Sequence, residues 1–184
     1  MKKASLSALL LLCACLIAVA QSRGWRVPTY HGLELGKATR ADVERAFGRP
    51  VWSGHPIYEE PEGEVGDEFL YEYENVGGFD GRTSVYLNAR SGVVRAISLY
   101  PNHRRPLSFN DAVARYGKEY IERGSDLGPC PTAEELRGYK PPGRREYPIF
   151  LVYPESGMYV SVGPNNQVQE VSYLLRCPHR RRTA

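Results

Sequence analysis

The sequence lacks the short motifs by which common catalytic sites are recognised. It has no His-Glu-x-x-His, no Gly-x-Ser-x-Gly, no Cys-x-x-Cys and no glycine-rich phosphate loop. The four histidines, His31, His55, His103 and His179, show no metal-ligand spacing with the cysteines. We therefore expect a non-catalytic protein that needs neither a metal nor another cofactor.

The one long hydrophobic run lies at the N-terminus. Two lysines precede the apolar run Leu9 to Val19, and small residues lead up to Ala20. This order is typical of a secretory signal peptide cleaved after Ala20. An uncleaved anchor is the weaker alternative because the run is short for a membrane span. A lipoprotein signal acylated at Cys15 is another alternative, but Cys15 lies inside the run. We expect a periplasmic or secreted protein.

Cysteine is scarce, and two of the four cysteines leave with the signal peptide. Cys130 and Cys177 then remain in an oxidising compartment, so we expect them to form a disulfide. In the loop-entropy description, a bond closing a loop of this length stabilises the fold by about 4 kcal/mol at most.

Net positive charge is also scarce. The formal charge of +3 includes the two signal-peptide lysines, so the mature chain is nearly neutral and we expect no nucleic-acid partner. Eight acids without a basic residue among them lie at Glu59, Glu60, Glu62, Glu64, Asp67, Glu68, Glu72 and Glu74. The simplest interpretation is a solvated loop and a disordered basic tail. The alternative for the tail, Arg180, Arg181 and Arg182, is a weak contact with an anionic surface.

A short capped helix is predicted from Arg40. Thr39 is its N-cap, Asp42 lies in the first turn, and Gly48 and Pro50 end it. Val43, Ala46 and Phe47 should share its apolar face. A helix of about two turns is unstable alone, so a sheet must hold that face.

A second copy of this pattern begins at Ser108. Asp111 again follows three residues after the cap, and Tyr116-Gly117 repeats the aromatic-glycine ending, although the helix could continue through Tyr120 and Ile121. Each helix precedes segments with strand character. The predicted strands are 69–73, 83–87 and 93–100, and then 149–153, 158–162 and 167–175. Residues 51–67 read as an exposed loop in which Trp52 is the one large apolar side chain.

These patterns predict an α+β fold with two tandem repeats, at about 33–100 and 106–175. Each repeat is a helix followed by three antiparallel strands, and the helices lie on one face of the sheet. The predicted organisation is a signal peptide at 1–20, a single domain at 21–178 and a basic tail at 179–184. The insert 124–146 carries the cap signature Thr132-Ala-Glu-Glu135, which predicts one more short helix.

The first repeat also carries a resemblance to a known family. Leu35-Gly36, Thr39, Phe47-Gly48 and the strand pair around Val85 to Val94 resemble the SmpA/BamE-like and β-lactamase-inhibitor-protein-like repeats of bacterial envelope proteins. This resemblance implies a non-enzymatic module that binds another envelope or secreted protein. Two repeats look more like the inhibitor architecture, in which the helix-free face of the sheet is the binding surface.

Tyrosine is the abundant aromatic, with thirteen tyrosines against five phenylalanines. Such a surplus suits a half-exposed sheet face, either as packing at the sheet margins or as a binding surface. We take Tyr86 and Tyr100 as the candidate binding residues. Two alternatives stay open. One is a cell-wall or glycan hydrolase using Glu68 or Glu72, which needs two carboxylates within roughly 10 Å in one pocket. The other is a structural envelope protein held by its basic tail.

Overall fold

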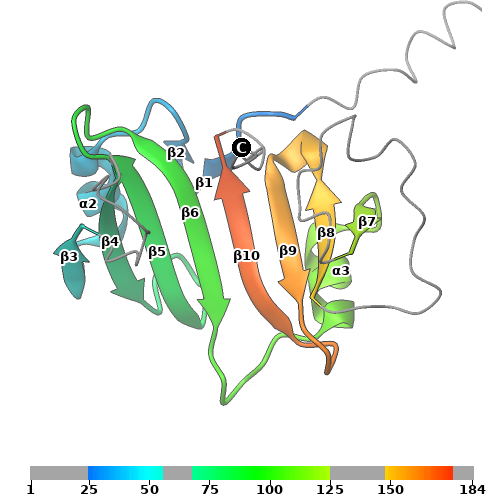
Figure 1. Ribbon diagram of the computed structural model, residues 1–184. Coiled ribbons are helices and arrows are strands. Elements are labelled where there is room, and N and C mark those ends of the chain that lie inside the picture. Colours follow the sequence, from blue (N-terminus) through cyan, green and yellow to red (C-terminus); the bar gives the residue numbers. More distant parts are fainter. Residues whose placement is uncertain (1–24, 56–67, 125–147, 176–184) are drawn as a thin grey trace, which may run out of the picture.

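The computed structural model describes residues 25–55, 68–124 and 148–175. Their dominant feature is an eight-stranded sheet in the order β3-β4-β5-β6-β10-β9-β8-β7, in which every pair of neighbours is antiparallel (Figure 1). Two α-helices accompany it, α2 at Arg40–Phe47 and α3 at Phe109–Tyr116. The predicted α+β class with an antiparallel sheet is therefore confirmed.

The strands of the large sheet fall into two runs along the chain, each following one helix. The bounds are β3 Trp52–Gly54, β4 Glu68–Glu74, β5 Gly81–Asn88, β6 Val94–Pro101, β7 Ile121–Arg123, β8 Ile149–Tyr153, β9 Met158–Val162 and β10 Val168–Leu174. A 3₁₀ turn, η1 at Pro154–Ser156, joins β8 to β9. The six long strands were all predicted, and the bounds of β8 and β9 agree residue for residue.

Two short edge strands were not predicted. The loop expected at 51–67 contains β3, which pairs with β4, and the expected continuation of the second helix through Ile121 is wrong because Ile121 begins β7. Each is a three-residue strand held by one neighbour, and so short a segment carries no clear alternation in sequence. Among the described residues, each helix is therefore followed by four strands of the large sheet, where three were predicted.

Both helices begin with the predicted capping box. The backbone N–H of Thr39 donates to the Asp42 carboxylate at 2.9 Å, and that of Ser108 donates to Asp111 at 3.0 Å. The Asp111 N–H also donates to the Ser108 hydroxyl at 3.1 Å. The hydrogen bonds from Thr39 hold the pKa of Asp42 down to about 2. These bonds satisfy backbone groups that the first helical turn leaves open.

The helix ends follow the sequence signals, with one error in the apolar face. Gly48 and Gly117 end α2 and α3 with φ of 80° and 98°, which suit glycine. Val43 is fully buried and Phe47 packs against the core, but Ala46 is exposed, contrary to the prediction. A two-turn helix laid on a sheet buries a narrow stripe, so its third apolar position turns to solvent.

A small hairpin precedes the first helix. Its strands, β1 at Thr29–Tyr30 and β2 at Leu33–Glu34, pair antiparallel through a turn at His31 and Gly32. Tyr30 is buried against Tyr173 of β10, with ring centroids 5.0 Å apart. The sequence analysis treated this segment only as a lead-in, because two-residue strands give no periodic signal.

The core lies along one set of alternating strand residues. Val85, Ile97, Val160 and Val171 are fully buried, and Val43 of α2 and Ala112 of α3 belong to the same cluster. Several tyrosines join it, namely Tyr30, Tyr71, Tyr73 and Tyr153. The tyrosine surplus therefore serves the core as well as the sheet surface. The hydroxyls of Tyr30 and Tyr73 are buried without a hydrogen-bond partner.

The sheet is joined at its centre by β6 and β10, whose register pairs Ser98 with Ser172. The two strand runs, β3 to β6 after α2 and β7 to β10 after α3, are here called the two halves of the sheet, and the same connections occur at corresponding points of each. Each cap residue bridges the residue just before the last strand that follows its helix, Thr39 with Val93 and Ser108 with Gln167. The first residue of each helix also donates to a turn carbonyl, Arg40 to Gly92 at 3.0 Å and Phe109 to Asn166 at 2.8 Å.

Candidate binding surface and cleft

The strand residues that alternate with the core residues form a second surface, here called the outer face. Successive side chains of a strand point to opposite sides of a sheet, so the register places outer-face residues in rows across the strands. The central row crosses all eight strands. It consists of Trp52, Glu72, Ser84, Ser98, Ser172, Tyr159, Val152 and Ile121.

The middle of this row is a hydrogen-bonded cluster. The hydroxyl oxygens of Ser98 and Ser172 lie 2.6 Å apart, and a carboxylate oxygen of Glu170 lies within hydrogen-bond distance of both, 2.9 Å from that of Ser98, so the two hydroxyl protons are shared among three contacts. Ser172 is fully buried and Ser98 nearly so. Because a buried hydroxyl is costly without a partner, the cluster keeps the two central strands in register.

Tyr159 borders the cluster from β9. Burial raises the pKa of its hydroxyl, and the neighbouring Glu170 carboxylate raises it further because a tyrosinate there would repel a second negative charge. At neutral pH Tyr159 therefore presents a protonated hydroxyl to the outer face. Its ring packs edge-on against Phe150 of β8, with centroids 5.6 Å apart.

The serines of the cluster sit in a poor position for nucleophilic catalysis. Ser98 lies in the middle of β6, which is paired on both sides, so its ladder partners take up the backbone N–H groups that an oxyanion hole needs. Glu170 is the acid in contact with both hydroxyls, and none of the three described histidines is hydrogen-bonded to them. The arrangement suits a structural network at the centre of a surface.

The two predicted binding residues both lie on the outer face and are half-buried. Tyr86 stands between Leu70 of β4 and Ala96 of β6, while Tyr100 stands beside Arg82. Tyr86 lies opposite Ala96, which is four positions before Tyr100 in β6, so the two tyrosines are offset along the strands by about 13 Å. They therefore belong to one surface but not to one pocket.

Tyr100 is part of a charged group that the sequence analysis missed. The Arg82 guanidinium lies over its ring at 4.6 Å from the centroid and forms an ion pair with Glu72 at 3.5 Å. A cation over an aromatic face is attracted by the ring electrons and loses freedom of rotation. Arg82 and Tyr100 occupy opposed positions on neighbouring strands, so alternation within both strands was the signal that could have paired them.

The outer face carries further aromatic side chains that were not predicted to act. Trp52 is 43% exposed on the edge strand β3, and Phe150 and Tyr159 are half-buried on β8 and β9. With Tyr86 and Tyr100 they spread over strands from both halves of the sheet. Applying the alternation argument to 149–153 and 158–162 would have placed Phe150 and Tyr159 on this face.

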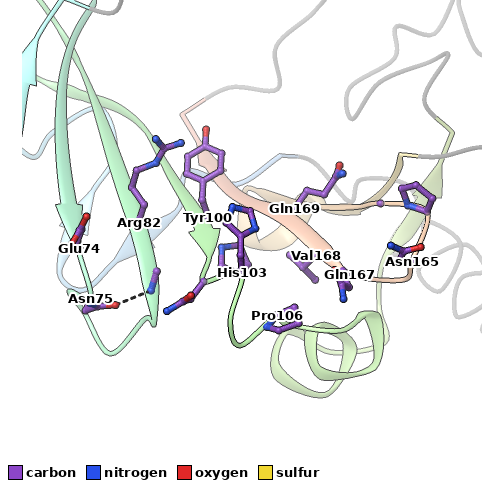
Figure 2. Close-up of a pocket in the computed structure, with 15 residues that line it drawn as sticks. Glu74, Asn75, Arg82, Tyr100, His103, Pro106, Asn165, Gln167, Val168 and Gln169 are labelled. Carbon is purple, nitrogen blue, oxygen red and sulfur yellow. Dashed lines mark hydrogen bonds between the residues drawn. The ribbon is translucent and has the colours of Figure 1, made fainter.

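A cleft of about 720 Å³ opens where the two halves of the sheet meet. Figure 2 shows its lining side chains, which come from the ends of β4, β5 and β6, from the segment 102–106 and from the hairpin 163–169. Glu74 is the one acid in this lining, and neither Glu68 nor Glu72 contributes to it. The carboxylate pair that the hydrolase alternative requires is therefore not assembled in this cleft.

Other predicted features lie outside the described residues. These are the signal peptide with Cys15 and Ala20, the cysteines Cys130 and Cys177, the tail Arg180 to Arg182, and the cap signature from Thr132. Among the described residues, no group of three histidine, cysteine or acidic side chains could hold a metal ion. No helix in the described ranges is both long and apolar enough to cross a membrane.

Comparisons with protein-family models, with curated proteins and with solved structures found no match for this chain.

Proposed function

We propose that this chain is an exported, non-catalytic binding module that holds another envelope or secreted protein against its outer face. The observation that carries the proposal is the set of partly exposed aromatic side chains on the side of the sheet away from the core, which come from five strands: Trp52, Tyr86, Tyr100, Phe150 and Tyr159. Such a surface is broad and regular, and it combines large rings with low side-chain entropy. Interfaces take most of their binding energy from residues of this kind.

The proposal includes two repeats and places both helices on the core side of the sheet. Support comes from the matching connections at Thr39 and Ser108 and from the pairing of Ser98 with Ser172, which stand at the same place in the two strand runs. Val43 and Ala112, one from each helix, enter the same core cluster. The position of α2 and α3 behind the sheet in Figure 1 supports this arrangement.

Tyr86 and Tyr100 are the proposed anchors for the partner. Both rings are half-buried, so their positions are already restricted before binding and little further freedom is lost. Arg82 adds a guanidinium whose ion pair with Glu72 is long, at 3.5 Å, so it keeps donors for a partner's carboxylate or carbonyl groups. Aromatic rings beside an arginine are typical of the residues that dominate interface energy.

Co-purification tests the proposal. The mature protein, immobilised and exposed to an envelope extract of its source organism, should retain a partner that Tyr86→Ala/Tyr100→Ala loses. With that partner purified, each single alanine change should weaken binding by about 30-fold, as removal of an anchor worth about 2 kcal/mol does.

Two matched variants guard against loss by misfolding. Tyr86→Phe/Tyr100→Phe keeps the rings and should retain the partner, and Lys37→Ala removes an exposed ion pair with Glu34 beside α2 and should change nothing. Equal retention by the double alanine variant and the wild type would exclude Tyr86 and Tyr100 as anchors.

A further inference from the structure

The cleft at the junction of the two halves has two chemically different walls. One wall is the uncharged hairpin 163–169, which presents the side-chain amides of Asn165, Gln167 and Gln169. The other wall carries Arg82, Tyr100 and His103. Figure 2 shows Arg82, Tyr100 and Gln169 rising on the same side of the sheet, so these three side chains border a common space.

The side-chain amides of the hairpin wall, here called the amide wall, are available to a ligand. Asn75 and Asn102 of the same cleft use their side chains to hold local turns, as acceptors for the backbone N–H groups of Gly81 and Arg104. Asn165, Gln167 and Gln169 are exposed, and within the described ranges their side chains make no hydrogen bond. Each offers a donor and an acceptor side by side, which is the pattern that a hydroxyl group, itself donor and acceptor, can satisfy.

The opposite wall supplies an aromatic surface. Tyr100 is held by the Arg82 guanidinium over its ring, and its hydroxyl makes no hydrogen bond to the part of the chain that the structure describes. Two prolines, Pro106 and Pro164, add apolar ring surface at the cleft margin. A ligand that fits both walls must combine an apolar C–H surface with several hydroxyl groups.

We propose that this cleft binds a neutral oligosaccharide. A sugar ring has C–H faces that pack on a tyrosine and hydroxyls that pair with side-chain amides, and the cleft volume lies within the range of about 300–1,000 Å³ seen in small-molecule sites. The charges favour a neutral ligand, because the cleft lining carries one arginine, Arg82, and one acid, Glu74, whose formal charges cancel. This inference does not depend on the protein partner of the outer face.

Calorimetric titration of the mature protein tests the cleft directly. The probes are three neutral trisaccharides, maltotriose, cellotriose and triacetylchitotriose, with trigalacturonate and triglycine as an acidic and a peptide competitor. At least one neutral trisaccharide should bind with a Kd of about 1 mM or tighter. Because neither partner's net charge drives the contact, raising the salt concentration should change the affinity by less than about twofold.

Variants place the ligand in the cleft. Gln169→Ala should weaken binding by about threefold to tenfold, which corresponds to one or two neutral hydrogen bonds. Tyr100→Ala should weaken it by more than about tenfold, while Tyr100→Phe, which keeps the ring, should stay within about threefold. Lys37→Ala, beside α2, should bind as the wild type does. Gln169 is not among the proposed anchors of the protein partner, so its variant separates this inference from the proposed function.

The inference is overturned if none of the three neutral trisaccharides binds. Tighter binding of trigalacturonate, with strong salt dependence, would identify an anion site instead, and tighter binding of triglycine would identify a peptide site. Binding that survives both Gln169→Ala and Tyr100→Ala, in variants whose thermal midpoints match that of the wild type, would also contradict it.

Discussion

Ser98 of β6 and Ser172 of β10 face each other where the two strand runs of the sheet meet, with their hydroxyl oxygens 2.6 Å apart. A Glu170 carboxylate oxygen accepts within hydrogen-bond distance of both hydroxyls, and two hydroxyl protons are shared among the three contacts, so the contact between the halves is polar although it is almost fully buried. A hydrogen-bonded pair of small residues specifies the strand register more strictly than apolar contacts do, because a slip leaves buried hydroxyls without partners.

Truncating this pair should cost stability in a coupled way. We expect Ser172→Ala and Ser98→Ala each to lower the free energy of unfolding by about 1–2 kcal/mol, and the double variant to lose less than the sum by about 0.5–1 kcal/mol. Urea unfolding of the four proteins measures this cycle. Ser161→Ala is the matched control, because Ser161 is also buried on the outer face but its side chain makes no hydrogen bond with the described residues. Its change should stay within about 0.5 kcal/mol.

The two helix caps should contribute similar amounts to the free energy of unfolding. Thr39→Ala and Ser108→Ala should each lower the free energy of unfolding by about 1 kcal/mol, since each removes the N-cap of a two-turn helix. Hydrogen bonds lower the pKa of both Asp42 and Asp111, so their contribution is present above about pH 4 and fades as the pH falls through the folded values. Denaturant titrations at neutral and acid pH measure both effects, and equal stability of wild type and cap variants at neutral pH would contradict them.

The buried tyrosines should make the fold sensitive to alkali. Burial raises the pKa of Tyr30 and of Tyr153 to about 12, against about 10 in the unfolded chain. Below pH 10 both states are protonated, whereas above it the unfolded chain releases protons that the folded chain keeps. Stability should therefore fall above about pH 10, by about 1.4 kcal/mol per pH unit for each such tyrosine.

Tyr30→Phe separates this effect from general alkaline unfolding. The Tyr30 hydroxyl is buried without a partner, so its removal should cost little at neutral pH and should flatten the loss of stability above pH 10. Unfolding curves at about pH 8 and about pH 11 measure the difference. Identical slopes in wild type and variant would show that Tyr30 does not titrate in this way.

The proposed disulfide has its own test. Cys130 and Cys177 remain after signal cleavage, and export exposes them to oxidation, so alkylation without reductant should label neither thiol in the mature protein. Mass spectrometry should detect one cross-linked peptide pair. Cys177→Ser should then lower the free energy of unfolding by a few kcal/mol, at most about 4 kcal/mol. Full alkylation of both thiols in the unreduced protein would rule the pairing out.

The parts of the fold that could be predicted are those with a periodic or capped signature. Thr39 and Ser108 fixed the helix starts because a cap is a local interaction between neighbours in sequence. The hydrophobic runs at 149–153 and 158–162 predicted two strands, and the structure has β8 and β9 with the same bounds. The edge strands β3 and β7 could not be found this way, since each depends on a neighbouring strand that is distant in sequence.

The candidate site shows the same division. Alternation placed Tyr86 and Tyr100 on one surface, but it could not reveal that Tyr100 lines a cleft with Gln169, because β6 and β10 become neighbours only when the sheet assembles. Similarly, nothing local to Ser98 indicates Ser172 as its partner. The ion pair of Arg82 with Glu72 also depends on cross-strand register.

Site-specific photocrosslinking tests the central claim most directly. A benzoylphenylalanine placed at position 86 on the outer face should capture the co-purified partner, whereas the same group at position 45, on the exposed side of α2, should not. Arg45 is a suitable reference because its side chain is 75% exposed in an ion pair with Asp42. Capture from position 45 with equal or greater yield than from position 86 would contradict binding through the outer face.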